Sequence, residues 1–209
     1  MLLFSRMLTL TGNPRDTMPW ASSITAYVNA ATTLDVSCWS ATYGLPLGTV
    51  VWSARVESQA EHEASIASLA ADEKYFDLVE QARDMVTSPG EDTLRTIIHG
   101  TPGTPPGVGA VVQLTTAVAV VDRMADAVAW SVDIAKHAED LAGYPVFVAL
   151  DRFGQMGTIA WLSSTPDMAA ADAAQAKVSA SPTYLDLLAA TKGLFIPGSG
   201  HVAQAVRFA

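Results

Sequence analysis

The chain has 209 residues, of which 50% are hydrophobic and 16% are charged, and this composition predicts a soluble, packed protein. The formal net charge of −9 argues against binding to nucleic acid or to an anionic membrane, because no basic patch is left for phosphate groups. The single cysteine, Cys38, excludes an intrachain disulfide and a CxxC metal or redox site, and it favours a cytoplasmic location.

The first half of the chain predicts a strand, a helix, two strands, a long helix and a final strand. Trp20, Ile24, Tyr27 and Ala31 recur at helical spacing, and "GLPL" between the two middle strands is a hairpin signal. The long helix is expected to bend near residues 71–74. The expected elements are residues 2–10, 13–33, 34–43, 48–56, 58–85 and 93–99.

A segment dense in glycine and proline, "GTPGTPPG" at residues 100–107, separates this half from a second half with the same order of elements. The final helix of the second half is expected to break at Ser181-Pro182. Its elements are expected at residues 108–119, 121–142, 144–153, 157–164, 167–192 and 201–208. A short linker predicts that the units 1–99 and 108–209 pack together.

The two halves are copies of one unit. "GTVVWSARVES" (48–58) returns as "GTIAWLSSTPD" (157–167), and "YFDLV" (75–79) returns as "YLDLL" (184–188). Trp20 matches Trp130 at an offset of 110 residues, whereas Trp52 matches Trp161 at 109, because the turn "GLPLG" is one residue longer than "GQMG". Aromatic residues in step on both sides of a single gap indicate an internal duplication.

The order strand-helix-strand-strand-helix-strand is the ferredoxin-like split βαβ motif, whose helices cover one face of its sheet. The other face of each sheet must also be buried, and a second sheet packed against it would achieve this. We therefore predict an α+β fold in which tandem ferredoxin-like repeats pack sheet to sheet as a pseudo-dimeric α+β barrel within one chain.

The stretch "VVWSARVESQAEHEASIASLAADEKYFDLV" (50–79) resembles the third strand and bent second helix of the dimeric α+β barrel superfamily. Trp52-Ser53 at the strand end and Tyr75-x-x-Leu78 late in the helix carry the resemblance, which covers nearly the whole chain as two tandem copies. The superfamily includes antibiotic-biosynthesis-type monooxygenases, NIPSNAP-like proteins and haem-degrading relatives. The resemblance implies a fold and leaves the reaction open.

The haem-degrading relatives use an Asn on the first strand and a Trp–His pair in the second helix. Neither half of this chain carries these residues at those places, so that activity is not expected and no cofactor is predicted. Haem binding through another ligand, such as His137, stays open.

His137 is the candidate catalytic residue. It shares a helix face with Trp130, Ile134 and Leu141, and its match in the first half is Tyr27. A histidine there could act as a general base or hydrogen-bond to a ligand, because its pKa lies near neutrality. The alternative is a half-buried helix histidine bonded to a backbone carbonyl or to solvent.

Three further aromatic residues could shape a ligand pocket between sheet and helices. Trp130, Trp161 and Tyr27 would line it, although large aromatic residues at matched positions are most often core. His99, at the end of the fourth strand, could face a cleft or could simply cap the strand. His62 stands between two glutamates and is expected to be solvated. The histidines do not recur at metal-ligand spacing, so no metal site is predicted.

Arg55 and Arg152 are the candidate polar ligands, because their matches in the other half are Ser164 and Thr42. An inward-facing arginine could hold a carboxylate, whereas one at a sheet edge would reach water. Other charges also fall in expected strands, and these are Arg6, Arg95, Asp151 and Arg207.

The residues leave two functions open. The first is binding of a small, mostly apolar molecule in a helix–sheet pocket, with cofactor-independent monooxygenation or isomerisation as its enzymatic form. The alternative is a non-catalytic interaction or assembly subunit that contacts copies of itself or a larger complex.

Overall fold

The computed structural model describes residues 1–87, 89–101 and 103–209, and it confirms the expected order of elements. The second helix of each half is divided into two, at Ala71–Asp72 and at Ala180–Ser181, close to the expected bend and break. The elements are β1 (Leu2–Thr9), α1 (Pro14–Ala31), β2 (Ser37–Tyr43), β3 (Thr49–Val56), α2 (Gln59–Ala70), α3 (Glu73–Glu80), β4 (Glu91–His99), β5 (Val111–Val118), η1 (Val121–Arg123), α4 (Met124–Ala142), β6 (Val146–Asp151), β7 (Thr158–Thr165), α5 (Met168–Ser179), α6 (Pro182–Ala189) and β8 (His201–Arg207).

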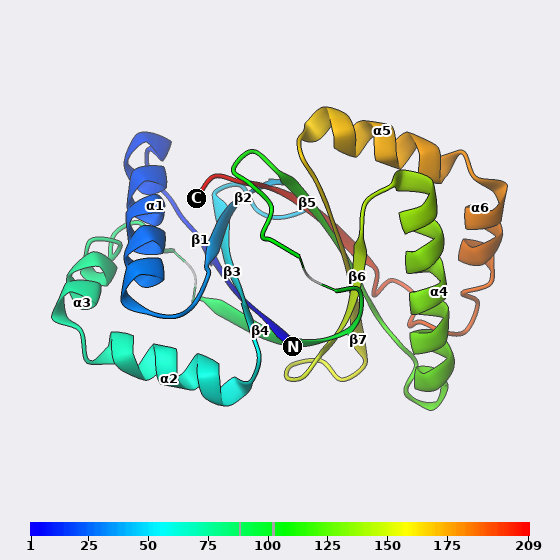
Figure 1. Ribbon diagram of the computed structural model, residues 1–209, viewed down its shortest axis with the longest axis horizontal. Helices are drawn as coiled ribbons and strands as arrows, with labels where there is room; N and C mark the ends of the chain where they lie inside the picture. The colour runs from blue at the N-terminus through cyan, green and yellow to red at the C-terminus, as the bar shows by residue number, and fades with distance from the viewer. Residues whose placement is uncertain (88, 102) are drawn as a thin grey trace.

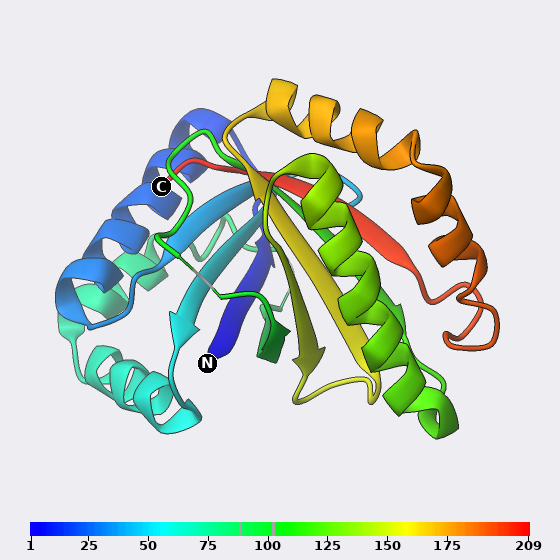
Figure 2. The same ribbon diagram turned by 45° about the vertical axis from the view of Figure 1, so that its right-hand side comes forward.

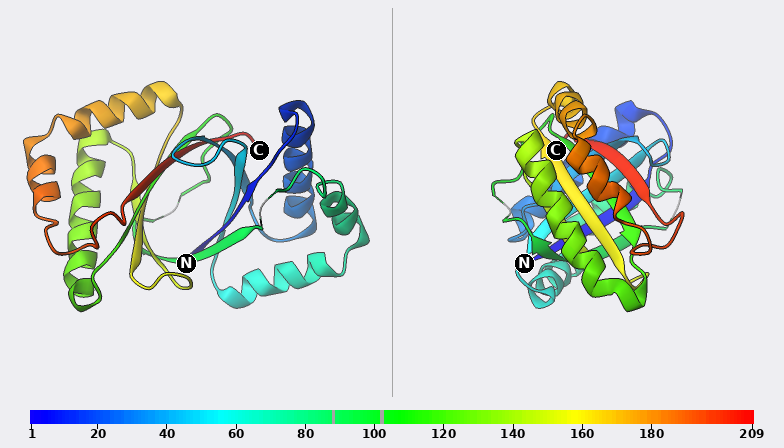
Figure 3. Two further views of the ribbon diagram at one scale, coloured as in Figure 1. Left: turned by 180° about the vertical axis from the view of Figure 1, so that it is seen from behind. Right: turned by 90° about the vertical axis from the view of Figure 1, so that its right-hand side faces the viewer.

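The strands form one closed antiparallel barrel in the order β1-β3-β2-β8-β5-β7-β6-β4. The first repeat supplies the sheet β2-β3-β1-β4 and the second supplies β6-β7-β5-β8, each in the ferredoxin-like order. The two sheets face each other, as predicted, and they are also hydrogen-bonded edge to edge at the β2–β8 and β4–β6 junctions. The helices of the two repeats lie on opposite outer sides of the barrel (Figures 1 and 3).

Polar N-caps set where the helices begin. Asn13 accepts a hydrogen bond from the amide of Arg15 at the start of α1. Where the long helix divides, the Asp72 carboxylate caps α3, and Ser181 caps α6 in the matching place. The break predicted at Ser181-Pro182 arises because proline fits the first turn of a new helix and not the interior of an old one.

Each repeat has its own core between helices and sheet, built around a tryptophan pair. The rings of Trp20 and Trp52 are 6.0 Å apart at 81°, and those of Trp130 and Trp161 have the same separation and angle. The indole N–H of Trp20 donates to the carbonyl of Leu78, and the Trp130 N–H donates to Leu187. The duplication therefore preserves this edge-to-face contact together with the hydrogen bond of the helix tryptophan, whereas Trp52 donates to Thr25 Oγ1 and Trp161 to the carbonyl of Ser131.

The two junctions of the barrel have different chemistry at matched positions. Arg95 of β4 stands opposite Asp151 of β6, with Nε and Oδ1 2.6 Å apart and both side chains buried. The matched pair at the β2–β8 junction is Ala41 opposite Ala205. Burial raises the pKa of Asp151, and this outweighs the opposite effect of Arg95. An ion pair thus fills a place where the same fold also accepts two methyl groups.

Candidate ligand cavities

Within the described residues, one cavity in each repeat and one between the repeats are large enough for a small molecule. The first-repeat cavity, about 580 Å³, lies between the sheet and helices α1 to α3. The second-repeat cavity, about 360 Å³, lies in the matching place between the sheet and helices α4 to α6. Figure 2 shows these helices on the outer side of the second-repeat sheet. The barrel bore, about 530 Å³, is enclosed by the strands of both repeats and by linker residues 103–106.

The second-repeat cavity contains two of the predicted ligand-binding residues. Trp130 and Trp161 both line it, and Phe195 packs against them at ring distances of 5.4 and 5.7 Å. In the first repeat the position of Phe195 is held by Val86, since both form the matching β-bridge. The larger aromatic side chain takes up part of the space that the first-repeat cavity leaves open.

His62 lines the first-repeat cavity and is the functional candidate that the sequence interpretation missed. Only 9% of this residue is exposed, and its Nε2 has no hydrogen-bond partner among the described residues. Its ring lies 4.2 Å from the ring of Phe4. The expectation of a solvated side chain is therefore wrong. His62, Ser65 and Leu69 form the buried stripe of α2, and this i, i+3, i+7 spacing was the signal available in the sequence.

An ion pair stands beside His62 on the wall of the same cavity. Arg6 Nε and Nη2 donate to the two carboxylate oxygens of Asp92 at 2.8 and 2.7 Å. The matched residues in the second-repeat cavity are Thr115 and Val202, and His62 itself is matched by Ala171. The first-repeat cavity therefore has three ionisable side chains where the second repeat has uncharged ones at the matched positions, so the fold does not require them.

His137 and Tyr27 occupy matched positions and contact matched helix caps. The Tyr27 hydroxyl donates to the Asp72 carboxylate at 2.5 Å, and His137 Nε2 lies 3.3 Å from the hydroxyl of Ser181. This hydrogen bond raises the pKa of Tyr27 and lowers that of Asp72. Neither residue is part of a described cavity wall. Because Nε2 of His137 faces Ser181, this residue does not offer an axial ligand to a haem in those cavities.

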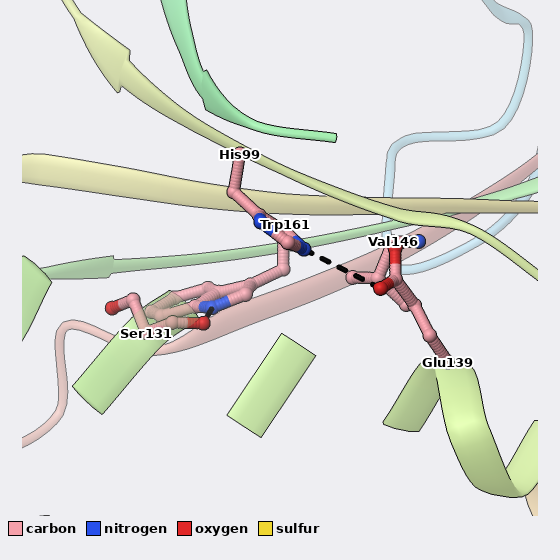
Figure 4. A network of polar contacts seen from close by, with 5 residues as sticks. All are labelled: His99, Ser131, Glu139, Val146 and Trp161. Carbon is pink, nitrogen blue, oxygen red and sulfur yellow. Dashed lines mark hydrogen bonds and ion pairs between the residues drawn. The ribbon is translucent and has the colours of Figure 1, made fainter. Parts of the chain in front are cut away.

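His99 joins the two repeats. Its Nε2 lies 3.4 Å from Oε2 of Glu139 on α4, as Figure 4 shows, while the other Glu139 oxygen accepts the backbone N–H of Val146. The matched residue Asn29 makes both hydrogen bonds to Val36 instead. Figure 4 also shows the Trp161 indole N–H directed at the carbonyl of Ser131.

The two candidate arginines lie in different surroundings. Arg55 lines the barrel bore, where its guanidinium donates to the carbonyl of Gly103 in the linker. Arg152 is exposed, and its backbone amide bonds to the carbonyl of Leu94. Of the seven predicted residues, two line the second-repeat cavity and one lines the bore, while the other four lie outside the described cavity walls. The catalytic role of His137 stays a prediction.

We expect His62 to make the protein less stable below about pH 6.5. Burial lowers the pKa of His62, so the unfolded chain, whose histidine pKa is about 6.5, binds the proton more readily than the folded one. Well above pH 6.5 the histidine therefore costs no stability, and the free energy of unfolding falls as the pH drops through that value. The loss in urea midpoint between about pH 7.5 and about pH 5 should be larger in the wild type than in His62→Ala, which copies the matched Ala171. Equal losses would contradict the burial of the imidazole.

The described residues, 1–87, 89–101 and 103–209, contain no group of three or more His, Cys, Asp or Glu side chains placed to hold a metal ion. Within the same ranges, no helix has the length and apolar character needed to cross a membrane.

No protein-family model and no curated protein matches the chain in sequence. Its structure is similar to that of a proposed monooxygenase from Fusobacterium nucleatum, with a TM-score of 0.72 and 8% identity, covering 100% of this chain and 92% of that one. A proposed monooxygenase from Lactobacillus acidophilus gives a TM-score of 0.66 at 13% identity, covering 99% and 93% of the two chains. An anthrone oxidase-like protein gives 0.63 at 14% identity, covering 98% and 91%.

At these identities the likeness concerns the fold alone. The closed barrel, the strand order within each repeat and the solved structures agree with the resemblance seen in the sequence. The chain has the fold of the dimeric α+β barrel superfamily, with both halves of the barrel in one polypeptide.

Proposed function

We propose that the protein binds a small, mostly apolar molecule in the first-repeat cavity and that Nε2 of His62 meets its polar group. The observation that carries this proposal is the buried Nε2 without a partner on the wall of a cavity of about 580 Å³. A buried polar atom left unpaired costs free energy, and the matched Ala171 shows that the fold does not need it. The remaining wall is rich in apolar side chains, including Phe4, Trp20 and Trp52.

The chemistry available to His62 is proton transfer. Burial lowers the pKa of His62, so its imidazole is neutral near pH 7 and can accept a proton at Nε2. A proton taken from an acidic carbon of the ligand and returned to another carbon is an isomerisation that needs no further reagent. With O₂ as oxidant, an activated CH₂ group would become a carbonyl, one oxygen atom entering the product and the other leaving as water. The monooxygenase descriptions of the similar structures fit this second reaction.

The tryptophans provide a reporter in each cavity. Trp20 and Trp52 line the first-repeat cavity, Trp130 and Trp161 the second-repeat cavity, and Trp39 the bore. Protein labelled with 5-fluorotryptophan, with each ¹⁹F resonance assigned by a Trp→Phe variant, would be titrated with 2-naphthol. We expect saturable shifts at Trp20 and Trp52, because the naphthalene ring suits the apolar wall and its hydroxyl can bond to His62.

Loss of the His62 hydrogen bond should weaken 2-naphthol binding about tenfold in His62→Ala, which corresponds to about 1.4 kcal/mol. Naphthalene, which has no hydroxyl, serves as the control and should bind both proteins equally well. Shifts confined to Trp130 and Trp161 would move the site to the second repeat and overturn the role of His62. If none of the five resonances responds and the native mass spectrum shows an oligomer, the assembly function replaces this one.

A further inference from the structure

The barrel bore has a row of hydroxyl side chains across its first-repeat wall. Ser37, Ser53, Ser5 and Thr93 lie side by side in the strand register, one on each of β2, β3, β1 and β4. All four line the bore. They occupy inward-facing positions of the barrel, which in small barrels are usually filled by apolar side chains.

The second repeat has an apolar row at the matched positions. Phe147, Leu162, Leu114 and Ala203 lie in the same register on β6, β7, β5 and β8, and they line the same bore. Strands β1 and β5 are diametrically opposed in the closed strand order, so a hydroxyl wall faces an apolar wall. The apolar row shows that the fold accepts hydrocarbon at these positions. The hydroxyl row is therefore not explained by the architecture.

The charged groups of the bore follow the same division. Each Asp, Glu, Lys or Arg among its lining residues belongs to the first repeat: Asp35, Arg55, Glu91 and Arg95. Nη1 of Arg95 donates to Thr93 Oγ1 at 3.1 Å, and its Nε faces Asp151. These contacts use two of the three guanidinium nitrogens, and Arg95 is only 7% exposed.

Two hydroxyls of the row remain available. Ser53 Oγ accepts the indole N–H of Trp39 at 2.9 Å. The hydroxyls of Ser5 and Ser37 have no hydrogen-bond partner among the described residues, although Ser37 is only 4% exposed. Neither oxygen is among the fully buried unpaired atoms of the described residues, so both are open to the bore, where a hydroxyl normally bonds to water or to a bound molecule.

We propose that the barrel bore is a second binding site, separate from the first-repeat cavity, for a flat apolar ring compound with neutral oxygen substituents along one edge. The ring lies on Leu114, Leu162 and Phe147, and its oxygens face Ser5 and Ser37. The ligand is neutral because Arg95 is already paired with Asp151 and Arg55 donates to the Gly103 carbonyl, while Asp35 and Glu91 would repel a carboxylate. The bore volume of about 530 Å³ is within the usual range for such ligands.

The test uses 2,7-dihydroxynaphthalene and the ¹⁹F resonance of 5-fluorotryptophan at Trp39. The two hydroxyls of this diol lie on the same side of the ring system but on different rings, which suits Ser5 and Ser37 because strand β3 separates them and places them about 10 Å apart. We expect a saturable shift of Trp39. The double variant Ser5→Ala/Ser37→Ala removes only two oxygen atoms and should weaken binding at Trp39 about tenfold. Ser164→Ala, which removes a hydroxyl from the opposite wall of the bore, is the matched control and should leave the affinity unchanged.

Each other outcome overturns the inference in a recognisable way. If the Trp39 resonance does not shift when the diol is added up to its solubility limit, the bore is not a binding site. Naphthalene binding at Trp39 as tightly as the diol, or a diol affinity unaffected in the double variant, removes the role of the hydroxyl row. Tighter binding of 2-naphthoate than of the diol would contradict the inference that the ligand is neutral. The resonances of Trp20 and Trp52 report the first-repeat cavity separately, so failure at one site is distinguishable from failure at the other.

Discussion

Replacing Asp151 with alanine should destabilise the protein by about 3 kcal/mol, because it leaves the buried guanidinium of Arg95 without its carboxylate. The double variant Arg95→Ala/Asp151→Ala should recover most of this loss. It recreates at the β4–β6 junction the Ala41–Ala205 pair that already exists at the β2–β8 junction. Urea unfolding of the single and double variants measures both quantities.

The loss of stability in the other single variant, Arg95→Ala, should depend on pH. Burial raises the pKa of Asp151, and removal of Arg95 would raise this pKa further, so Arg95→Ala should cost less stability at acidic pH, where the carboxyl group is protonated and neutral. Asp151→Ala has no such dependence from this pair. If the double variant is as unstable as Asp151→Ala, the ion pair is required by the barrel and the comparison of the two junctions fails.

Replacing Gly44 with alanine should also have a large effect, and Gly154 provides its matched control. Both glycines follow the second strand of their repeat with positive φ, 77° and 94°, so either alanine costs about 1–2 kcal/mol. A Cβ at Gly44 would also overlap the carbonyl oxygen of Val202 in β8, whereas nothing lies within 4 Å of one at Gly154.

Gly44→Ala should therefore lose at least about 2 kcal/mol more than Gly154→Ala, because the overlap is relieved only by opening the β2–β8 junction. Thermal and urea unfolding of the two variants test the difference. Equal losses would mean that this edge of the barrel moves apart at little cost. The "YG" and "FG" pair looks equivalent in sequence, and only the barrel closure distinguishes its two glycines.

Most of the fold was predictable because it repeats. A duplicated pattern provides two independent samples of each element, so the match of Trp20 with Trp130 and that of Trp52 with Trp161 supported each other. The strand starts were less accurate. β2 begins at Ser37 rather than residue 34, and β6 at Val146 rather than residue 144. In the first repeat the side chain of Asn29 bonds to both backbone groups of Val36, which ties down the segment before the strand.

The candidate sites were less predictable, because inward and outward positions alternate along a strand. Asp151 and Arg152 are neighbours, and the structure buries the first and exposes the second. A difference of one residue in register reverses which of them is buried, and the sequence does not specify that register. His62 was missed for a different reason: its two glutamate neighbours suggested solvent, although the helical stripe already placed it with Leu69.

The fused chain also changes what a single substitution can do. In a symmetric dimer of identical chains every substitution appears twice, at places related by the twofold axis. A new serine on one wall would then face the same serine on the other, and an arginine at one seam would be mirrored at the second. Here one gene encodes both walls separately, so each wall can diverge without its image. A barrel with one polar wall and one apolar wall is therefore possible for this chain, but not for a symmetric dimer.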